Sequence, residues 1–227
     1  FVSYSYYEVY TNAQRAFSCL GFPYGADEDA AYIITWFELY NLKGIDLFCS
    51  FIETNDEQYN YKINLFKNER VIDLNNKSNL ITGPGVIDYI VSKFNTSNVN
   101  EFNLINCYDP IFLIPLLSRY IKKDIYGKIL NDNEILCLIN KEKISINKIL
   151  FEKKINNSIK IILSNMPNRN QTLDIEINLI DSKKYLSLGL SPNQNNWDKI
   201  AALAFQSYVP ESEESRSKGA GGGDDND

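Results

Sequence analysis

A change in the spacing of apolar residues near residue 125 most constrains the fold of this chain. Before it, apolar residues recur mainly every three or four positions, as on one face of a helix. After it, they alternate with polar residues, most strictly from Leu173 to Ile180, where one strand face must be buried and the other exposed to water. The sequence therefore predicts an α+β fold: an N-terminal helical pair, a central mixed or largely antiparallel sheet, and a C-terminal helix.

Several segments have the composition of strands. A hairpin is expected around Asn131-Asp132-Asn133, because these turn residues separate two alternating segments. The segments expected to form strands are 45–52, 102–107, 125–130, 134–140, 143–148, 158–164, 173–180 and 185–190. The polar face of the strand 173–180 carries Asp174 and Glu176, so these carboxylates are interpreted as solvent-exposed rather than as a catalytic pair.

Other segments have apolar residues at helical spacing. The expected helices are 4–20, 26–42, 84–94, 109–120 and 196–207. Glycine and proline in Gly21-Phe22-Pro23 separate the first two, and Gly83-Pro84-Gly85 predicts a chain break before the third. Asp109 followed by Pro110 predicts a capped start for the fourth.

The length of 227 residues is enough for one well-buried core. We expect one structural domain overall, with three parts: a helical hairpin over 1–44, an α+β core over 45–210, and a glycine-rich tail over 211–227. Because glycine is costly to hold still, an ordered tail would have to be docked against this chain or a partner.

The segment from Gly21 to Gly44 carries a recognisable pattern. It resembles the opening of a bacterial family catalogued as domain of unknown function 3726, with Tyr24 where that family has a tryptophan. The matching positions are Gly21, Gly25, Glu28, Ala30, Trp36, Leu42 and Gly44.

The same segment is more distantly similar to the N-terminal arm of the type-2 malate and L-lactate dehydrogenases. In those enzymes a Gly-Ile-x-Ser-His-Gly run supplies a catalytic histidine. Here the corresponding residues, from Gly44 to Cys49, are Gly-Ile-Asp-Leu-Phe-Cys. The resemblance therefore does not imply that dehydrogenase chemistry.

The resemblance to the uncharacterised family returns in the tail. The family pattern of tyrosine, proline, Ser-Arg, a glycine run and a final Asp-Asn-Asp is matched by Tyr208, Pro210, Ser215, Arg216, Gly219, Ala220, Gly221, Gly223, Asp225, Asn226 and Asp227. This chain departs from the pattern at Gly222, where the family usually has alanine, and in a spacer shortened to Asp224.

The tail is the candidate site. Ser215 and Arg216 offer a hydroxyl and a forked cation suited to carboxylate or phosphate, and the backbone amides of glycines could join them. Those glycines are Gly219, Gly221 and Gly223. The acid-base candidates are Glu28 and Asp225. As an alternative, the oxygens of Asp224, Asp225 and Asp227 could bind Mg²⁺ or Ca²⁺.

Composition excludes several chemistries. These 227 residues contain no histidine, so histidine-dependent hydrolysis and histidine metal sites are not available to them. The four cysteines lack paired spacing, and buried free thiols are expected. A net charge of -6 and scattered lysines argue against nucleic-acid binding. No membrane span or apolar leader is recognised, so a cytoplasmic location is expected.

Two functions remain open. The first is a small-molecule metabolic enzyme or a binder of an anionic metabolite, at a site formed by the tail and the segment 21–44. The second is a noncatalytic subunit or assembly module whose tail docks into a partner or into another copy of the chain. No cofactor, nucleic acid or membrane partner is predicted.

Overall fold

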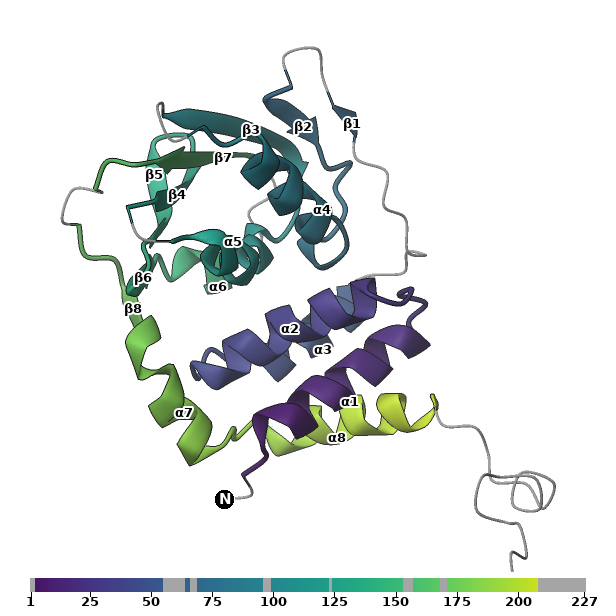
Figure 1. Ribbon diagram of the computed structural model, residues 1–227. Helices are drawn as coiled ribbons and strands as arrows, with labels where there is room; N and C mark the ends of the chain where they lie inside the picture. Colours follow the sequence, from purple (N-terminus) through teal and green to yellow (C-terminus); the bar gives the residue numbers. More distant parts are fainter. Residues whose placement is uncertain are drawn as a thin grey trace, which may run out of the picture.

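The structure is a computed structural model, which describes residues 3–54, 64–65, 69–95, 99–122, 124–152, 157–167 and 171–207. Figure 1 shows two layers: helices α1, α2, α3 and α8 lie together, and the sheet with α4, α5 and α6 lies above them. The chain leaves the helical layer after α3 and re-enters it, through α7, at α8. The predicted α+β class is confirmed.

The helical layer joins the two ends of the described chain. Its helices are α1 (Tyr6–Cys19), α2 (Ala26–Leu39), α3 (Gly44–Thr54) and α8 (Gln194–Phe205). Helix α1 begins with a capping box, in which the Glu8 amide donates to Ser5 Oγ and the Ser5 amide donates to Glu8 Oε2. The Tyr4 and Trp197 rings lie 4.3 Å apart, so α8 closes the layer over α1.

The second layer contains an eight-stranded sheet in the order β1-β2-β3-β7-β4-β5-β6-β8. Only the β2–β3 pair is parallel among the strands described. The strands are β1 (Asn64–Leu65), β2 (Val71–Asp73), β3 (Asn100–Cys107), β4 (Tyr126–Asn131), β5 (Glu134–Ile139), β6 (Lys143–Ile146), β7 (Asn157–Ser164) and β8 (Ile175–Asn178). The predicted hairpin and mixed sheet are confirmed.

Among the residues that the structure describes, six further helices follow in the chain between α3 and α8. They are α4 (Asn79–Ser92), η1 (Pro110–Phe112), α5 (Leu113–Tyr120), α6 (Ile149–Glu152), η2 (Leu179–Asp181) and α7 (Ser182–Leu188). Within the described ranges, no helix combines the length and the apolar character needed to cross a membrane.

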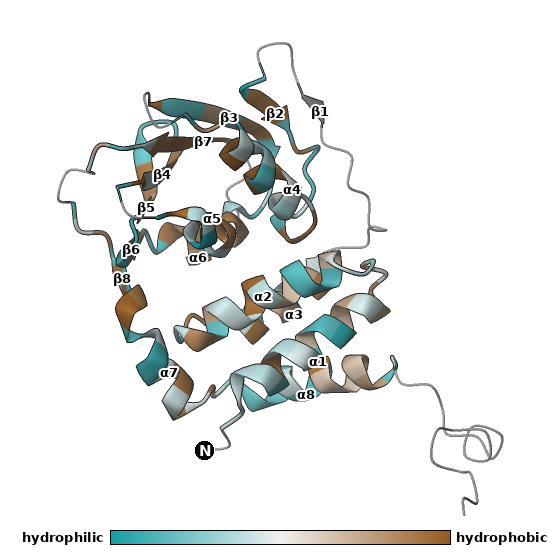
Figure 2. Cartoon of the chain, viewed as in Figure 1, coloured by the Kyte–Doolittle hydropathy of each residue, from teal (hydrophilic) through white to brown (hydrophobic). Residues whose placement is uncertain are grey.

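Side chains alternate between the two faces of the sheet along each strand, and one of these faces is buried. On β7, Ile159, Ile161 and Leu163 are buried, while Lys160 and Ile162 are less covered. Gly127 on β4 lies under Leu117 and Ile121, which places α5 over the same face as the buried residues. In Figure 2, β7 is brown along most of its length, since it carries apolar residues on both faces. As predicted, Asp174 and Glu176 are exposed.

Three expectations about local structure are wrong. The segment 45–52 is not a strand but part of α3, and 185–190 is mostly helical rather than extended. Gly83-Pro84-Gly85 does not break the chain but lies inside α4, whose start is fixed earlier by Ser78, which accepts from the Leu80 amide at 3.2 Å. In each case contacts from other elements override a short local pattern.

Helix α3 shows how this happens. Glu38, near the end of α2, is buried, and its Oε2 accepts from the Ile45 amide at 3.0 Å. The Gly44 amide bonds to the same carboxyl group. A carboxylate on the first amides of a helix offsets both their unpaired donors and the positive helix end. Glu38 therefore supplies a cap for α3 that a reading of 45–52 alone does not include.

Burial raises the pKa of Glu38 above its ordinary value, and neighbouring Asp46 adds to this, against the two backbone amides that lower it. The folded state thus holds the Glu38 proton more tightly than the unfolded state. The stabilisation from this protonation is complete below the ordinary glutamate pKa and is lost as pH rises through the raised pKa.

We expect the Glu38→Gln variant to reveal this dependence of stability on pH. Urea unfolding from about pH 4 to 8 should show the wild type losing stability relative to the variant as pH rises, because the variant has no proton to release. If the difference in unfolding free energy between the wild type and the variant stayed constant with pH, or changed in the opposite direction, the raised pKa of Glu38 would be contradicted.

Candidate functional site

The structure places only one of the predicted site residues. Glu28 lies half-buried in the first turn of α2. The others lie outside the described residues, so their roles stay predictions: Ser215, Arg216, Gly219, Gly221, Gly223, Asp224, Asp225 and Asp227. The predicted proximity of Glu28 to the tail is likewise untested.

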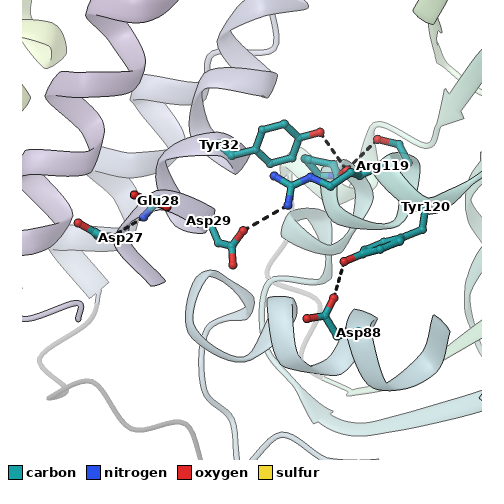
Figure 3. A network of polar contacts seen from close by, with 9 residues as sticks. Asp27, Glu28, Asp29, Tyr32, Asp88, Arg119 and Tyr120 are labelled. Carbon is teal, nitrogen blue, oxygen red and sulfur yellow. Dashed lines mark hydrogen bonds and ion pairs between the residues drawn. The ribbon is translucent and has the colours of Figure 1, made fainter. Parts of the chain in front are cut away.

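Next to Glu28, a buried carboxylate has a structural role. Asp27 Oδ1 accepts from the Gly25 amide at 3.0 Å and the Glu28 amide at 2.8 Å, and Asp27 Oδ2 accepts from Ser18 Oγ at 2.8 Å. These bonds close the turn between α1 and α2, and Figure 3 shows the contact of Asp27 with Glu28. Asp27 therefore anchors the beginning of α2, on which Glu28 sits.

A polar network joins α5 to the neighbouring helices (Figure 3). Arg119 Nη1 lies 3.3 Å from Asp29 Oδ1, and the guanidinium carbon lies 3.9 Å from the centre of the Tyr32 ring. On the next residue, the Tyr120 hydroxyl donates to Asp88 of α4. Since both partners of Arg119 come from α2, this network holds the two layers together.

Several ionisable groups are kept neutral by burial. Desolvation raises the pKa of Tyr6 and of Tyr40 to about 12 each. It also raises the pKa of the Cys107 thiol to about 12 and shifts that of Cys137 upward. At neutral pH these groups are protonated, so neither thiol is a ready nucleophile. Cys49, Cys107 and Cys137 are buried free thiols, as predicted, and Cys19 is partly exposed.

A cavity of about 270 Å³ opens between the two layers. Three segments form its wall: α3 from Leu47 onward, the segment 108–112 that follows β3, and α6. The lining residues are Leu47, Ser50, Phe51, Thr54, Tyr108, Asp109, Pro110, Ile111, Phe112, Leu150, Phe151 and Glu152. We call this the interlayer pocket. Sites between layers or domains are common places for small ligands.

The turn at Asp109 forms one side of the interlayer pocket. Asp109 has a left-handed backbone, with φ of 47°. Its Oδ2 accepts from Ser78 Oγ at 2.7 Å, and its Oδ1 accepts from the Asn79 amide at 2.8 Å. The Asn79 side chain in turn donates to the Tyr108 carbonyl. Asp109 therefore caps α4 from a distance of about thirty residues in sequence and fixes its own turn.

Left-handed residues gather at this edge of the sheet. Asn75, Asn76 and Asn106 have φ of 53°, 56° and 51°. They follow or end β2 and β3, the parallel pair, whose carboxyl ends therefore meet here. Asp73 Oδ1 ties them together by accepting from the Asn75 amide and Asn106 Nδ2, both at 2.9 Å. Carboxyl ends of parallel strands and strained backbone are both typical of ligand sites.

The chemistry of the interlayer pocket is apolar with acceptor groups. Phe51, Phe112 and Phe151 provide flat apolar surface. Asp109 and Glu152 provide carboxylates, and Ser50, Thr54 and Tyr108 provide hydroxyls; the lining includes no Lys or Arg. Such a wall suits a flat molecule with a neutral or positively charged donor group. Among the described residues, no three metal-ligating side chains gather as a metal site requires.

Sequence reasoning identified the Asp109-Pro110 pair but assigned it the wrong role. The Asp109 side chain does not cap the helix that follows it; Pro110 opens the short helix η1, and α5 begins only at Leu113. The cap acts on α4 because the parallel pairing of β2 with β3 brings Ser78 beside Tyr108. The aspartate before proline was the available signal, while its partner depends on the sheet.

Comparison with known proteins gives one family match. The family described as protein of unknown function (DUF3726) matches residues 4–78, which confirms the resemblance seen from Gly21 to Gly44 and does not extend to the tail. These residues include α1, α2, α3 and the cap of α4, and hence the α3 wall of the interlayer pocket. No curated protein matches the chain.

Two solved structures share the fold. Sulfolactate dehydrogenase from Methanocaldococcus jannaschii is 9% identical, with a TM-score of 0.61, over 91% of this chain and 97% of that one. An E. coli protein assigned as a malate/lactate dehydrogenase is 10% identical, with a TM-score of 0.62, over 95% of this chain and 97% of that one. The likeness thus extends well beyond the N-terminal arm. Residues 4–78 carry the DUF3726 pattern, on a chain that has the fold of these two dehydrogenases.

Proposed function

We propose that this chain binds a small organic metabolite in the interlayer pocket and belongs to small-molecule metabolism. The observation that carries the proposal is the Asp109 turn, where a left-handed residue with both carboxylate oxygens bonded forms the wall of a cavity between layers. A wall held in this way is preorganised, which lowers the cost of ordering it around a ligand.

The fold supports a metabolic role without specifying the reaction. The two similar structures are a sulfolactate dehydrogenase and a protein assigned as a malate/lactate dehydrogenase, both named after small hydroxy acids. The 227 residues of this chain contain no histidine to transfer a proton. In the interlayer pocket the groups of acid-base type are Asp109 and Glu152, of which Glu152 also lies 3.8 Å from Lys148.

Charge decides which ligand we expect. The wall carries the carboxylates of Asp109 and Glu152 and no Lys or Arg, so even with Lys148 3.8 Å from Glu152 it disfavours an anion relative to a cation. We therefore expect a flat ligand with a neutral or cationic donor group. An anionic metabolite would need a cation from elsewhere, and the proposed role of Arg216, with Ser215 and the glycine amides, would supply it.

The test compares three ligands that share a ring and differ in charge: benzylamine, benzamide and benzoate. At ten times Kd, benzylamine should stabilise the wild type by about 1.4 kcal/mol, which raises Tm by roughly 3 to 6 °C, and benzoate should do least. Ser50→Trp places a large side chain at an exposed position of the wall and should abolish the shift. Glu53→Trp, on the face of α3 that meets Lys199 of α8, should preserve it.

Two outcomes would separate the alternatives. A shift that survives in Ser50→Trp would remove the interlayer pocket as the site. Stabilisation by L-malate that disappears in Arg216→Ala would instead support the anionic site formed by the tail, and an unchanged shift would contradict that site.

The assembly function also has one supporting observation. Ile180, Leu186 and Leu188, on η2 and α7, are 66%, 47% and 66% exposed. Large exposed apolar side chains that lie close together in sequence are found at protein interfaces. Light scattering on the full chain and on a chain without residues 219–227 would show whether the tail contributes: a loss of mass with an intact fold favours assembly.

A further inference from the structure

The outer face of the sheet, on the side away from α5, carries a row of side chains in which charged and apolar residues alternate across the strands. Leu138 on β5 pairs with Lys128 on β4, Lys128 pairs with Ile162 on β7, and Ile162 pairs with Glu101 on β3. Residues paired across neighbouring strands lie on the same face with Cβ atoms about 5 Å apart. Lys128 is therefore flanked by an apolar side chain on each side.

The same face is hollowed. A cavity of about 500 Å³, which we call the sheet groove, lies over β4, β5 and β7. Its lining residues are Val99, Lys128, Ile135, Leu138, Ile162, Ser164, Met166, Pro167 and Gln171. Val99 and Met166 are 49% and 65% exposed. An apolar hollow of this size with few polar groups has the general character of a small-molecule site.

Lys128 is the cation of the sheet groove, and it lacks a counter-ion in the described part of the chain. Five other lysines there, at positions 93, 143, 148, 160 and 199, each lie within 4.0 Å of a carboxylate oxygen. On the outer face, Glu101 lies two strands from Lys128 and instead pairs with Lys160 at 3.3 Å. A half-buried lysine beside apolar walls favours a ligand that brings an anion and an apolar chain together.

We propose that the sheet groove binds an amphiphilic carboxylate, such as a medium-chain fatty acid. The alkyl chain lies against Leu138, Ile162 and Met166, and the carboxylate accepts from the Lys128 ammonium. Burial of the chain supplies most of the affinity, at about 0.8 kcal/mol per CH₂ removed from water, while Lys128 fixes the orientation and the preference for an acid. This site lies on a different face from the interlayer pocket and does not depend on it.

The test is calorimetric titration of the full chain with decanoate and, as a neutral match, decanol. Lys128→Met keeps an apolar stem and removes the charge, so decanoate should bind about tenfold more weakly while decanol is unchanged. Lys160→Met removes a charge from the same face and should leave both ligands unaffected. Met166→Glu, at a mostly exposed position, should weaken decanoate more than decanol.

Three results would overturn the proposal. The first is decanoate binding that is equal in the wild type and Lys128→Met. The second is an equal loss in Lys160→Met, which would mean a general effect of surface charge. The third is a doubled mass in light scattering with no decanoate binding, which would mean that a second copy of the chain covers the sheet groove.

Discussion

Replacing Gly44 with alanine should destabilise the protein by about 3 kcal/mol or more, enough to lower Tm by roughly 6 to 12 °C. A Cβ at Gly44 would overlap the backbone carbonyl oxygen of Ile34 and lie 2.8 Å from the backbone nitrogen of Glu38. Both atoms belong to α2, so no side-chain rotation can relieve the overlap. The helices α2 and α3 would have to separate, and packed interiors absorb such shifts at high cost.

Urea unfolding of Gly44→Ala and Gly127→Ala tests this expectation. Gly127 is also buried, but a Cβ there would meet the Ile121, Leu117 and Ile139 side chains at 3.4 to 3.6 Å, which is ordinary contact. We expect a change below about 1 kcal/mol for Gly127→Ala. If the two variants lost similar stability, the close approach of α2 and α3 at Gly44 would not be the reason for a glycine there.

The second large effect is expected for Asp109→Ala, which should cost about 2 to 3 kcal/mol. The change removes the acceptor of the Ser78 hydroxyl and of the Asn79 amide, and both of these residues are buried. An unpaired buried donor costs its full desolvation, which exceeds the ordinary net value of a hydrogen bond. The start of α4 and the wall of the interlayer pocket should both loosen.

Asp109→Gly separates the hydrogen bonds from the backbone conformation. Glycine adopts a φ of 47° without strain, so it removes only the acceptor. If the hydrogen bonds matter most, Asp109→Gly should lose nearly as much stability in urea unfolding as Asp109→Ala. A glycine variant as stable as the wild type would mean that the carboxylate does not hold the turn.

The sequence predicts those parts of the fold in which a short-range pattern of residues is enough to determine the secondary structure. Alternation between apolar and polar residues locates β3 and the hairpin of β4 and β5, and it places Asp174 and Glu176 on the exposed side. Helical spacing, with Gly21 and Pro23 as a stop, locates α1 and α2. In these segments the local pattern and the tertiary contacts agree.

Prediction failed where contacts with another element determine the secondary structure of a segment. The apolar segment 45–52 is compatible with a strand or a helix, and the choice is made by Glu38 and by the close approach of Gly44 to α2. The segment 185–190 is equally short; the Tyr185 ring packs edge-on against Tyr40 at 5.3 Å, and Gly189, with φ of 74°, ends the helix. Neither contact can be inferred from the nearby residues.

The same limit applies to the site. The aspartate before Pro110 is visible in the sequence, but its partners Ser78 and Asn79 are set by the parallel pairing of β2 and β3. The interlayer pocket also needs α3 and α6, which come from distant parts of the chain. The tail lies outside the residues 4–78 that the family matches, so Ser215 and Arg216 contribute only predictions.

The most direct test of the interlayer pocket as a ligand site is an amide-resolved NMR titration of the full chain with benzylamine. Our account predicts saturable shifts at Ser50 to Thr54, at Tyr108, Asp109, Ile111 and Phe112, and at Leu150 to Glu152, all of which disappear in Ser50→Trp. Saturable shifts confined to other segments, or no shift at these residues at millimolar benzylamine, would contradict it.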